Sequence, residues 1–268
     1  MAWRRANEIL IMDSNIREDL KSLWNRFDIK FLLCCTKYKT RYETVAPELD
    51  RVGITDYLVQ WDVPQTPIKD ILRAHIKTNK FLSNLGPFSC CLNHYRAIKT
   101  AFELGANSCL ILEDDIRFRR DLDFIKETHS LLPSDFDYAQ FENVKPWEMS
   151  FPEYFSLKDK NIVNMRWRRF SNLRGGGCYA LSRRTMQKMI EILELHISGK
   201  KIPLVINDYY VSQIAGINKY FCYPNVAVQA IVGDANSAVE GYWENYYRLG
   251  MRFEDYQMDG TTKPQIAH

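Results

Sequence analysis

The stretch CLILEDDIRF, residues 109–118, runs from an apolar segment directly into three consecutive carboxylates. Residues 108–112 have the length and composition of a buried β-strand, and helical patterns precede and follow them. Strands that alternate with helices are typical of an open α/β sheet, in which ligands bind at the carboxyl ends of the strands. Glu113, Asp114 and Asp115 fall at such an end. This stretch therefore predicts both the α/β class and the place of the functional site.

The rest of the chain repeats the alternation. Apolar runs predict further strands at residues 28–35, 57–61, 137–141, 178–181 and 202–206. Periodic apolar positions predict helices that begin after Thr40, near Cys91, at Leu122 and after Ser182. Thr40 and Glu43 have the spacing of a capping box for the first of these helices, and Pro47 is expected to kink or shorten that helix. Gly105 is expected to end the second helix in a left-handed conformation.

The length of 268 residues, with 46% hydrophobic composition, suits one sizeable core. We expect an N-terminal helical segment at residues 1–27, a single α/β domain at residues 28–237, and a C-terminal extension with a loose tail at residues 238–268. No internal repeat and no low-complexity linker divides the chain.

The charge and the cysteines limit the partners and the compartment. Lysine and arginine number 36 against 33 acids, and this net charge of +3 is too small to indicate wholesale binding of nucleic acid. The seven cysteines lack CxxC spacing and lie in apolar runs, as free thiols do in a reducing compartment. The longest apolar run, near residues 31–35, is far too short to span a bilayer. We therefore expect a cytoplasmic protein, with peripheral association at the inner membrane left open.

Three adjacent carboxylates repel one another, and partial burial raises the cost of keeping each one charged. A divalent cation removes this conflict, and oxygen ligands suit Mg²⁺ or Mn²⁺. The alternative is a solvated turn, in which the acids form weak surface ion pairs with Arg117, Arg119 and Arg120. The residues alone leave both interpretations open.

A glycine run provides a second candidate. Gly175, Gly176 and Gly177 permit close approach of the backbone to a ligand, and Arg174 directly before them is a candidate contact for a diphosphate. An ordinary turn is the alternative for the glycines. A short nucleic-acid-binding segment is a weaker alternative, because a single RGG leads directly into a strand.

Five motifs, taken together and in their order along the chain, resemble those of the family 25 glycosyltransferases. This family includes bacterial lipooligosaccharide galactosyltransferases and related collagen galactosyltransferases. The similarity covers roughly residues 28–232. SCCLNH has Ser89 and Asn93 where the family motif GCxxSH has glycine and serine, and Arg41 is the match for an arginine near the start of the family pattern. The motifs are SCCLNHYR (89–96), LILEDDIRF (110–118), GGGCYALSRR (175–184), NDYY (207–210) and YPNVAVQ (223–229).

The resemblance implies a GT-A fold: one α/β domain with a Rossmann-like mixed sheet flanked by helices. It also implies a nucleotide-sugar donor at the strand ends and a DxD-like motif that holds Mn²⁺, or Mg²⁺. Asp115 is then the expected direct ligand of the metal, with Glu113 as a second candidate. Asp114 or Glu113 would contact the ribose or a metal-bound water.

The other motifs supply further candidates. Asp208 is the expected general base, although a residue between a strand and a helix also serves as a helix cap. His94 is expected to face the nucleotide, with a satisfied core or surface histidine as the alternative. Gln229 is a candidate contact to the metal or the diphosphate, and a structural amide is equally expected.

The function that the resemblance implies is an inverting, metal-dependent transferase. It would move a hexose, galactose from UDP-galactose by preference, onto a saccharide acceptor of a bacterial lipooligosaccharide or a related surface glycan. Two alternatives use the same residues differently: a metal-dependent nucleotidyl or phosphoryl transferase, and a non-catalytic saccharide- or RNA-binding module.

Overall fold

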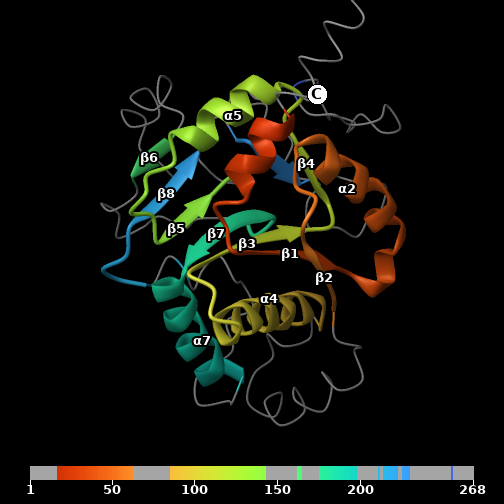
Figure 1. Cartoon of the computed structure of the whole chain (residues 1–268). Helices are drawn as coiled ribbons and strands as arrows, with labels where there is room; N and C mark the ends of the chain where they lie inside the picture. The colour runs from red at the N-terminus through yellow and green to blue at the C-terminus, as the bar shows by residue number, and fades with distance from the viewer. Residues whose placement is uncertain are drawn as a thin grey trace, which may run out of the picture.

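The computed structural model of the chain describes residues 17–62, 85–142, 162–164, 175–197, 211, 214–222, 225–229 and 255. Within them lie a seven-stranded mixed sheet, in the order β2-β1-β3-β7-β5-β8-β6, and a two-stranded ribbon of β4 and β9 (Figure 1). The strands are β1 (Ile29–Cys34), β2 (Leu58–Trp61), β3 (Ser108–Glu113), β4 (Ile116–Phe118), β5 (Tyr138–Gln140), β6 (Ile162–Asn164), β7 (Cys178–Ser182), β8 (Lys219–Cys222) and β9 (Ala227–Gln229).

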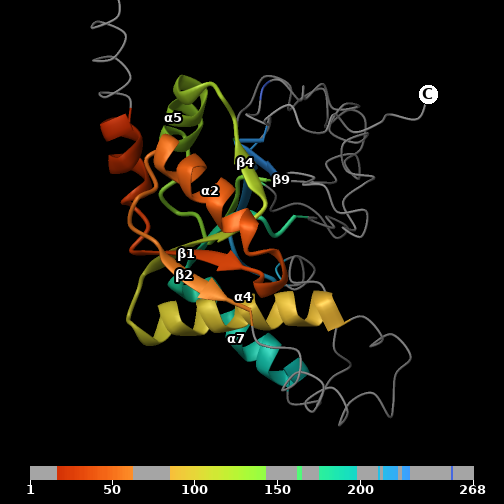
Figure 2. The ribbon, with the colours of Figure 1, turned by 90° about the vertical axis from the view of Figure 1, so that its right-hand side faces the viewer.

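Helices cover both faces of the sheet. They are α2 (Thr40–Arg51), α4 (Leu85–Glu103), α5 (Leu122–Ser130) and α7 (Arg183–Ile197), together with helical residues 17–24 and a 3₁₀ turn, η1 (Thr36–Tyr38). In two perpendicular views α4 and α7 lie on one face, whereas residues 17–24, α2 and α5 lie on the other (Figures 1 and 2). This arrangement confirms the predicted α/β class with a mixed sheet flanked by helices.

The strands alternate their side chains between two buried clusters. Leu32 of β1 packs in the cluster that contains Trp24, on the side of α2 and α5. Its neighbours Phe31 and Leu33 pack in the cluster that contains Ile98 of α4. Since β1 and β3 are covered on both faces, each contains a continuous apolar run, residues 31–34 in β1 and 109–112 in β3.

β1 runs parallel to both β2 and β3, whereas β7 runs antiparallel to β3. The carboxyl ends of β1, β2 and β3 therefore meet at one edge of the sheet. Cys35 follows β1 and Asp62 follows β2, whereas Glu113 is the last residue of β3 and Asp114 and Asp115 follow it. Topology thus gathers the candidate site from segments that are far apart in the sequence.

The end of α4 and the start of α7 lie where the sequence predicted them. Gly105 follows α4 with a φ of 84°, the left-handed conformation predicted for it. Ser182 caps α7, because its hydroxyl accepts a hydrogen bond from the backbone N–H of Thr185 at 3.3 Å.

The start of α2 differs from the prediction. The chain enters α2 directly from η1, so Lys39 occupies the N-cap position and Thr40 is already helical. The expected capping box with Glu43 does not form. Pro47 does not end the helix either, since α2 continues through it to Arg51. Lys39 makes no side-chain cap, and the turn at η1 supplies the entry instead.

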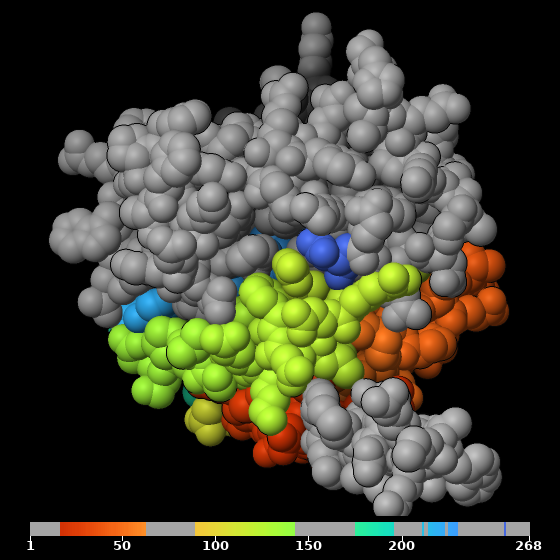
Figure 3. Space-filling view, turned by 90° about the horizontal axis from the view of Figure 1, so that it is seen from above, coloured from red at the N-terminus to blue at the C-terminus, as the bar shows by residue number. Residues whose placement is uncertain are grey.

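The face seen from above is formed, among the described residues, by α5 and the segments beside it and by α2 (Figure 3). Asp255, from the far end of the chain, is anchored to this face. Its carbonyl oxygen accepts a hydrogen bond from the N–H of Arg120 at 2.7 Å, and its carboxylate lies 3.5 Å from Arg119. Among the described helices, none has both the length and the apolar character that a bilayer crossing requires.

His129 of α5 is buried in an aromatic cluster. Its ring is stacked on Phe141 and meets Trp24 edge-on, with centroids 5.8 and 4.5 Å away. Neither ring nitrogen has a hydrogen-bond partner among the described residues. Burial, aided by the charge of Arg26, lowers the pKa of His129 from 6.5 to about 3. The imidazole is therefore neutral in the folded protein.

Because its imidazole is neutral when buried, His129 lowers the stability of the folded protein as the pH falls. Between its ordinary pKa and the lowered one, the unfolded chain binds a proton that the folded chain does not, so acidification favours unfolding. We expect the wild type to lose about 2 kcal/mol more stability than His129→Leu between about pH 7 and about pH 5. Urea titrations at several pH values measure this difference. Parallel pH profiles of the two proteins would contradict it.

Candidate functional site

The three carboxylates lie where β3 ends. Glu113 is the last residue of β3, and its N–H donates to the carbonyl of Gly177 at 2.8 Å, which extends the pairing of β3 with β7. Asp114 and Asp115 form the turn into β4 and are only 4% and 8% exposed. This is the sheet edge that the sequence predicted for them, and the low exposure argues against a solvated acidic turn.

Asp114 is held by the segment after β1. Its Oδ2 accepts a hydrogen bond from the N–H of Cys35 at 2.7 Å, and its Oδ1 lies 3.5 Å from Arg41. Burial raises the pKa of Asp114 to about 6, against the opposing effects of the Cys35 amide and the Arg41 charge. Asp114 therefore ties the acidic turn to the end of the neighbouring strand.

Within the described part of the chain, the carboxylate of Asp115 has fewer hydrogen-bond partners than that of Asp114. Its Oδ2 lies 3.3 Å from the Arg41 guanidinium, which itself stacks over the ring of Tyr38. Its Oδ1 is buried and has no hydrogen-bond partner among the described residues. Burial, followed by the charge of Glu113, raises the pKa of Asp115 to about 7. A buried carboxylate oxygen without a donor fits a divalent cation of the hard, oxygen-seeking type.

Glu113 is surrounded by three donor side chains from two other elements that the structure describes, α4 and β9. Its Oε1 is 2.8 Å from Nε2 of His94 and 3.6 Å from the Cys90 thiol, and its Oε2 accepts a hydrogen bond from Gln229 at 2.9 Å. Burial works to raise the pKa of Glu113, but the contacts with His94, Gln229 and Cys90 outweigh it, so the pKa lies below its usual value. Glu113 is thus held as a carboxylate.

The buried ring of His94, on α4, is held by protein groups at both nitrogens. Nδ1 lies 2.7 Å from the hydroxyl of Tyr179, and the two rings are stacked with centroids 5.7 Å apart. Nε2 faces Glu113. The role predicted for His94 toward the nucleotide stays a prediction, and what the ring does in this structure is orient Glu113.

The glycine run packs against two carboxylates, those of Glu113 and Glu142. Gln140 donates to the carbonyl of Gly175 at 2.9 Å, and the N–H of Gly177 donates to Glu142 at 2.9 Å. A Cβ on Gly177 would stand 2.8 Å from Glu142, and one on Gly176 would stand 3.4 Å from Oε1 of Glu113. The backbone approaches these carboxylates as closely as it does because side chains are absent.

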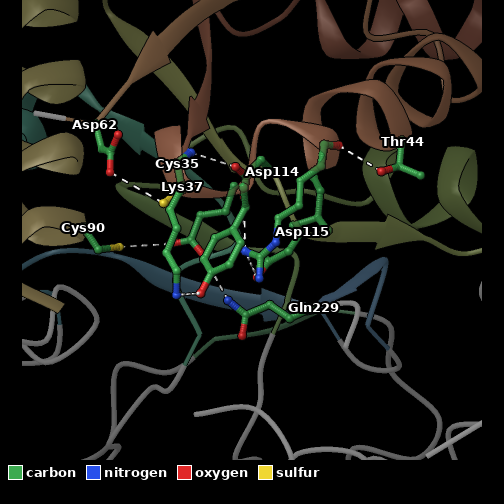
Figure 4. Close-up of polar contacts among 12 residues, drawn as sticks. Cys35, Lys37, Thr44, Asp62, Cys90, Asp114, Asp115 and Gln229 are labelled. Atoms are coloured by element: carbon green, nitrogen blue, oxygen red, sulfur yellow. Dashed lines mark hydrogen bonds and ion pairs between the residues drawn. The ribbon is translucent and has the colours of Figure 1, made fainter. Parts of the chain in front are cut away.

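Figure 4 shows how these groups lie, with Asp114 and Asp115 between the Cys35 segment and Gln229, and with Cys90 and Asp62 to one side. The sequence interpretation missed Cys90 and Asp62. Oδ1 of Asp62 accepts a hydrogen bond from the N–H of Thr36 at 2.8 Å. Its position directly after a strand was a signal that could have found it. Arg174 and Asp208, both predicted for the site, lie outside the described residues.

The sequence model of glycosyltransferase family 25, described as LPS biosynthesis proteins, matches residues 60–204. That match spans more than half of the 268 residues. The chain belongs to glycosyltransferase family 25. This family 25 glycosyltransferase is accordingly an enzyme, and its family implies a nucleotide-sugar donor and a saccharide acceptor. The family match favours transfer of a sugar over the phosphoryl-transfer and binding-module alternatives.

Two solved structures are distantly similar to the family 25 glycosyltransferase. One is a glycosyltransferase involved in the glycosylation of the major capsid of PBCV-1, with 12% identity, a TM-score of 0.43, and coverage of 84% of this chain and 100% of that one. Another is mannose-1-phosphate geranyltransferase from Thermus thermophilus, with 12% identity, a TM-score of 0.34, and coverage of 75% and 74%. A search of curated proteins gave no significant match. Likenesses this distant define no substrate for this enzyme.

Proposed function

We propose that this enzyme is an inverting, metal-dependent hexosyltransferase that moves galactose from UDP-galactose to a saccharide acceptor of a bacterial lipooligosaccharide or a related surface glycan. The observation that supports it best is Asp115, whose Oδ1 is buried without a partner among the described residues, at the carboxyl end of the sheet. Family membership supports the nucleotide-sugar donor.

The residues present fit a hard divalent cation, Mn²⁺ or Mg²⁺. Asp115 would supply the direct ligand through Oδ1, with Asp114 and Glu113 beside it to contact the ribose, a coordinated water or the same ion. Glu113 is the less free of the two neighbours, because His94 and Gln229 hold its oxygens. When bound, such a cation neutralises the charge that develops on the departing diphosphate.

Side chains of the protein would bind the diphosphate and accept the proton of the acceptor. Arg41 lies within 3.3–3.5 Å of the two aspartates and limits their mutual repulsion before the donor arrives. Arg174 is proposed to face the diphosphate. In the transfer itself the acceptor hydroxyl attacks the anomeric carbon from the face opposite the diphosphate, the bond to the diphosphate breaks, and Asp208 takes the hydroxyl proton. The roles of Arg174 and Asp208 rest on the sequence alone.

We propose a cytoplasmic enzyme that meets a glycolipid acceptor at the membrane surface without entering the bilayer. The seven cysteines, all free among the described residues, fit a reducing compartment. No role for nucleic acid is proposed, because the net charge of +3 is small.

A donor panel tests the proposal. The protein is incubated with UDP-galactose, UDP-glucose and other nucleotide sugars, each with saccharide acceptors, with Mn²⁺ or with chelator, and released nucleotide is measured. We expect UDP release from UDP-galactose that disappears with chelator. Turnover of another sugar nucleotide would correct the donor, and turnover unchanged by chelator would overturn the metal dependence. No release from any donor would contradict the proposal as a whole.

A further inference from the structure

A cysteine, a histidine and a glutamate converge beside the acidic turn. Cys90 and His94 lie one helical turn apart on α4, and both face Glu113 at the end of β3. Their ligand atoms, a thiol sulfur, an imidazole nitrogen and a carboxylate oxygen, all lie within 4.8 Å of one another. Oε1 of Glu113 lies 2.8 Å from Nε2 of His94 and 3.6 Å from Sγ of Cys90. These distances are close to those between two ligand atoms of a single metal ion.

We propose that Cys90, His94 and Glu113 form a cation site of their own, selective for a thiophilic divalent ion such as Zn²⁺. Sulfur, nitrogen and oxygen ligands together suit Zn²⁺, whereas Mn²⁺ and Mg²⁺ prefer oxygen alone. Three protein ligands leave the fourth tetrahedral position to water or to a substrate oxygen. The site is thus distinct in chemistry from the oxygen site proposed at Asp115, although Glu113 is a ligand here and a candidate contact there.

Groups behind the three ligands hold them in place. Nδ1 of His94 is engaged by the Tyr179 hydroxyl at 2.7 Å, which leaves Nε2 directed at the cluster. The second oxygen of Glu113 accepts a hydrogen bond from Gln229 at 2.9 Å. Hydrogen bonds of this kind fix the orientation of metal-binding histidines and carboxylates in known metal sites.

Space and access fit an ion as well. A Cβ on Gly176 would stand 3.4 Å from the Glu113 oxygen and 3.9 Å from His94 Nε2, so the bare glycine leaves room beside both ligands. Cys90 is exposed, so an ion can enter from solvent. Binding forms one metal–sulfur bond and releases the thiol proton to water. The ring proton of His94 moves from Nε2, where it is shared with Glu113, to Nδ1, where the Tyr179 hydroxyl accepts it, and the lone pair of Nε2 coordinates the ion.

Cobalt binding tests the site without any enzymatic assay. Co²⁺ substitutes for Zn²⁺, and a cysteine ligand gives it a thiolate-to-metal charge-transfer band in the near ultraviolet. We expect one Co²⁺ per chain to give this band, and we expect Zn²⁺ to displace that ion. The band should vanish in Cys90→Ser and persist in Cys35→Ser, which removes a nearby thiol that is not part of the cluster. Tyr179→Phe should keep the band but weaken Zn²⁺ binding by about 10- to 100-fold.

Asp115→Asn separates this site from the proposed donor site. We expect this variant to keep the cobalt–thiolate band, because Asp115 is not one of the three ligands. A wild-type protein without the band, or a band that survives Cys90→Ser, would overturn the inference. Since the readout is metal binding alone, its failure would leave the proposed transferase activity untouched, and the failure of that activity would leave this site untouched.

Discussion

Asp115→Asn is expected to lower sugar transfer by about 100- to 1000-fold, the loss typical when one group that stabilises developing charge is removed. The substitution keeps the shape of the side chain and removes its charge. Oδ1 of Asp115 has no partner among the described residues, and burial raises the pKa of Asp115 to about 7, so the ion pair of Oδ2 with Arg41 compensates the buried charge only in part. Released UDP, measured at saturating Mn²⁺, checks the expectation.

A measurement of thermal stability distinguishes this loss of activity from misfolding of the variant. Without metal, the Asp115→Asn protein should melt no lower than the wild type, since it removes a buried and poorly compensated carboxylate. Asp123→Asn, on the exposed surface of α5, removes the same charge and should keep full activity. An Asp115→Asn enzyme that retains most of its activity would refute the assignment of Asp115 as a metal ligand.

Gly175→Ala is expected to destabilise the fold by roughly 2–4 kcal/mol. Gly175 has a φ of 129°, a conformation that side chains rarely adopt. A Cβ there would also stand 2.9 Å from the backbone carbonyl of Glu142 and 3.0 Å from Gln140. Because backbone cannot move aside as a side chain can, strain and overlap add. Urea denaturation of the purified variant measures the loss.

Gly176→Ala is the matched control in the next position. Its φ is not positive, and its Cβ would meet Glu113 at an ordinary distance of 3.4 Å. We expect a change of stability within about 0.5 kcal/mol. Equal stabilities for the two variants would show that the backbone at Gly175 is not constrained in the way the structure indicates.

Local pattern was enough to predict the frame of the site. The apolar run before Glu113 and the helical periods on either side predicted a strand that ends in carboxylates, and β3 and its turn have that form. Gly105 was predictable for the same reason, since the end of α4 depends only on its own turn. Features that depend on neighbouring residues in the sequence are the ones that a single sequence reveals.

The partners of the carboxylates could not be predicted in the same way. Asp114 is held by a backbone N–H at Cys35, and a backbone donor leaves no trace in the sequence. Glu113 gathers His94, Cys90 and Gln229 from α4 and β9, which only the strand order brings together. The pairing of β4 with β9, which places Gln229 opposite Ile116, is equally long-range. The start of α2 was mispredicted because η1, and not Thr40, sets its entry.

The most direct test of the account is calorimetric titration of UDP into the wild type and into Asp115→Asn, each with Mn²⁺ and with chelator. If the carboxylates at the end of β3 hold a cation that binds the diphosphate, the wild type binds UDP at least about tenfold more tightly with Mn²⁺, which corresponds to about 1.4 kcal/mol. The variant should show no such gain. Equal UDP affinity in all four titrations would contradict the central claim that Asp115 serves a metal-bound donor.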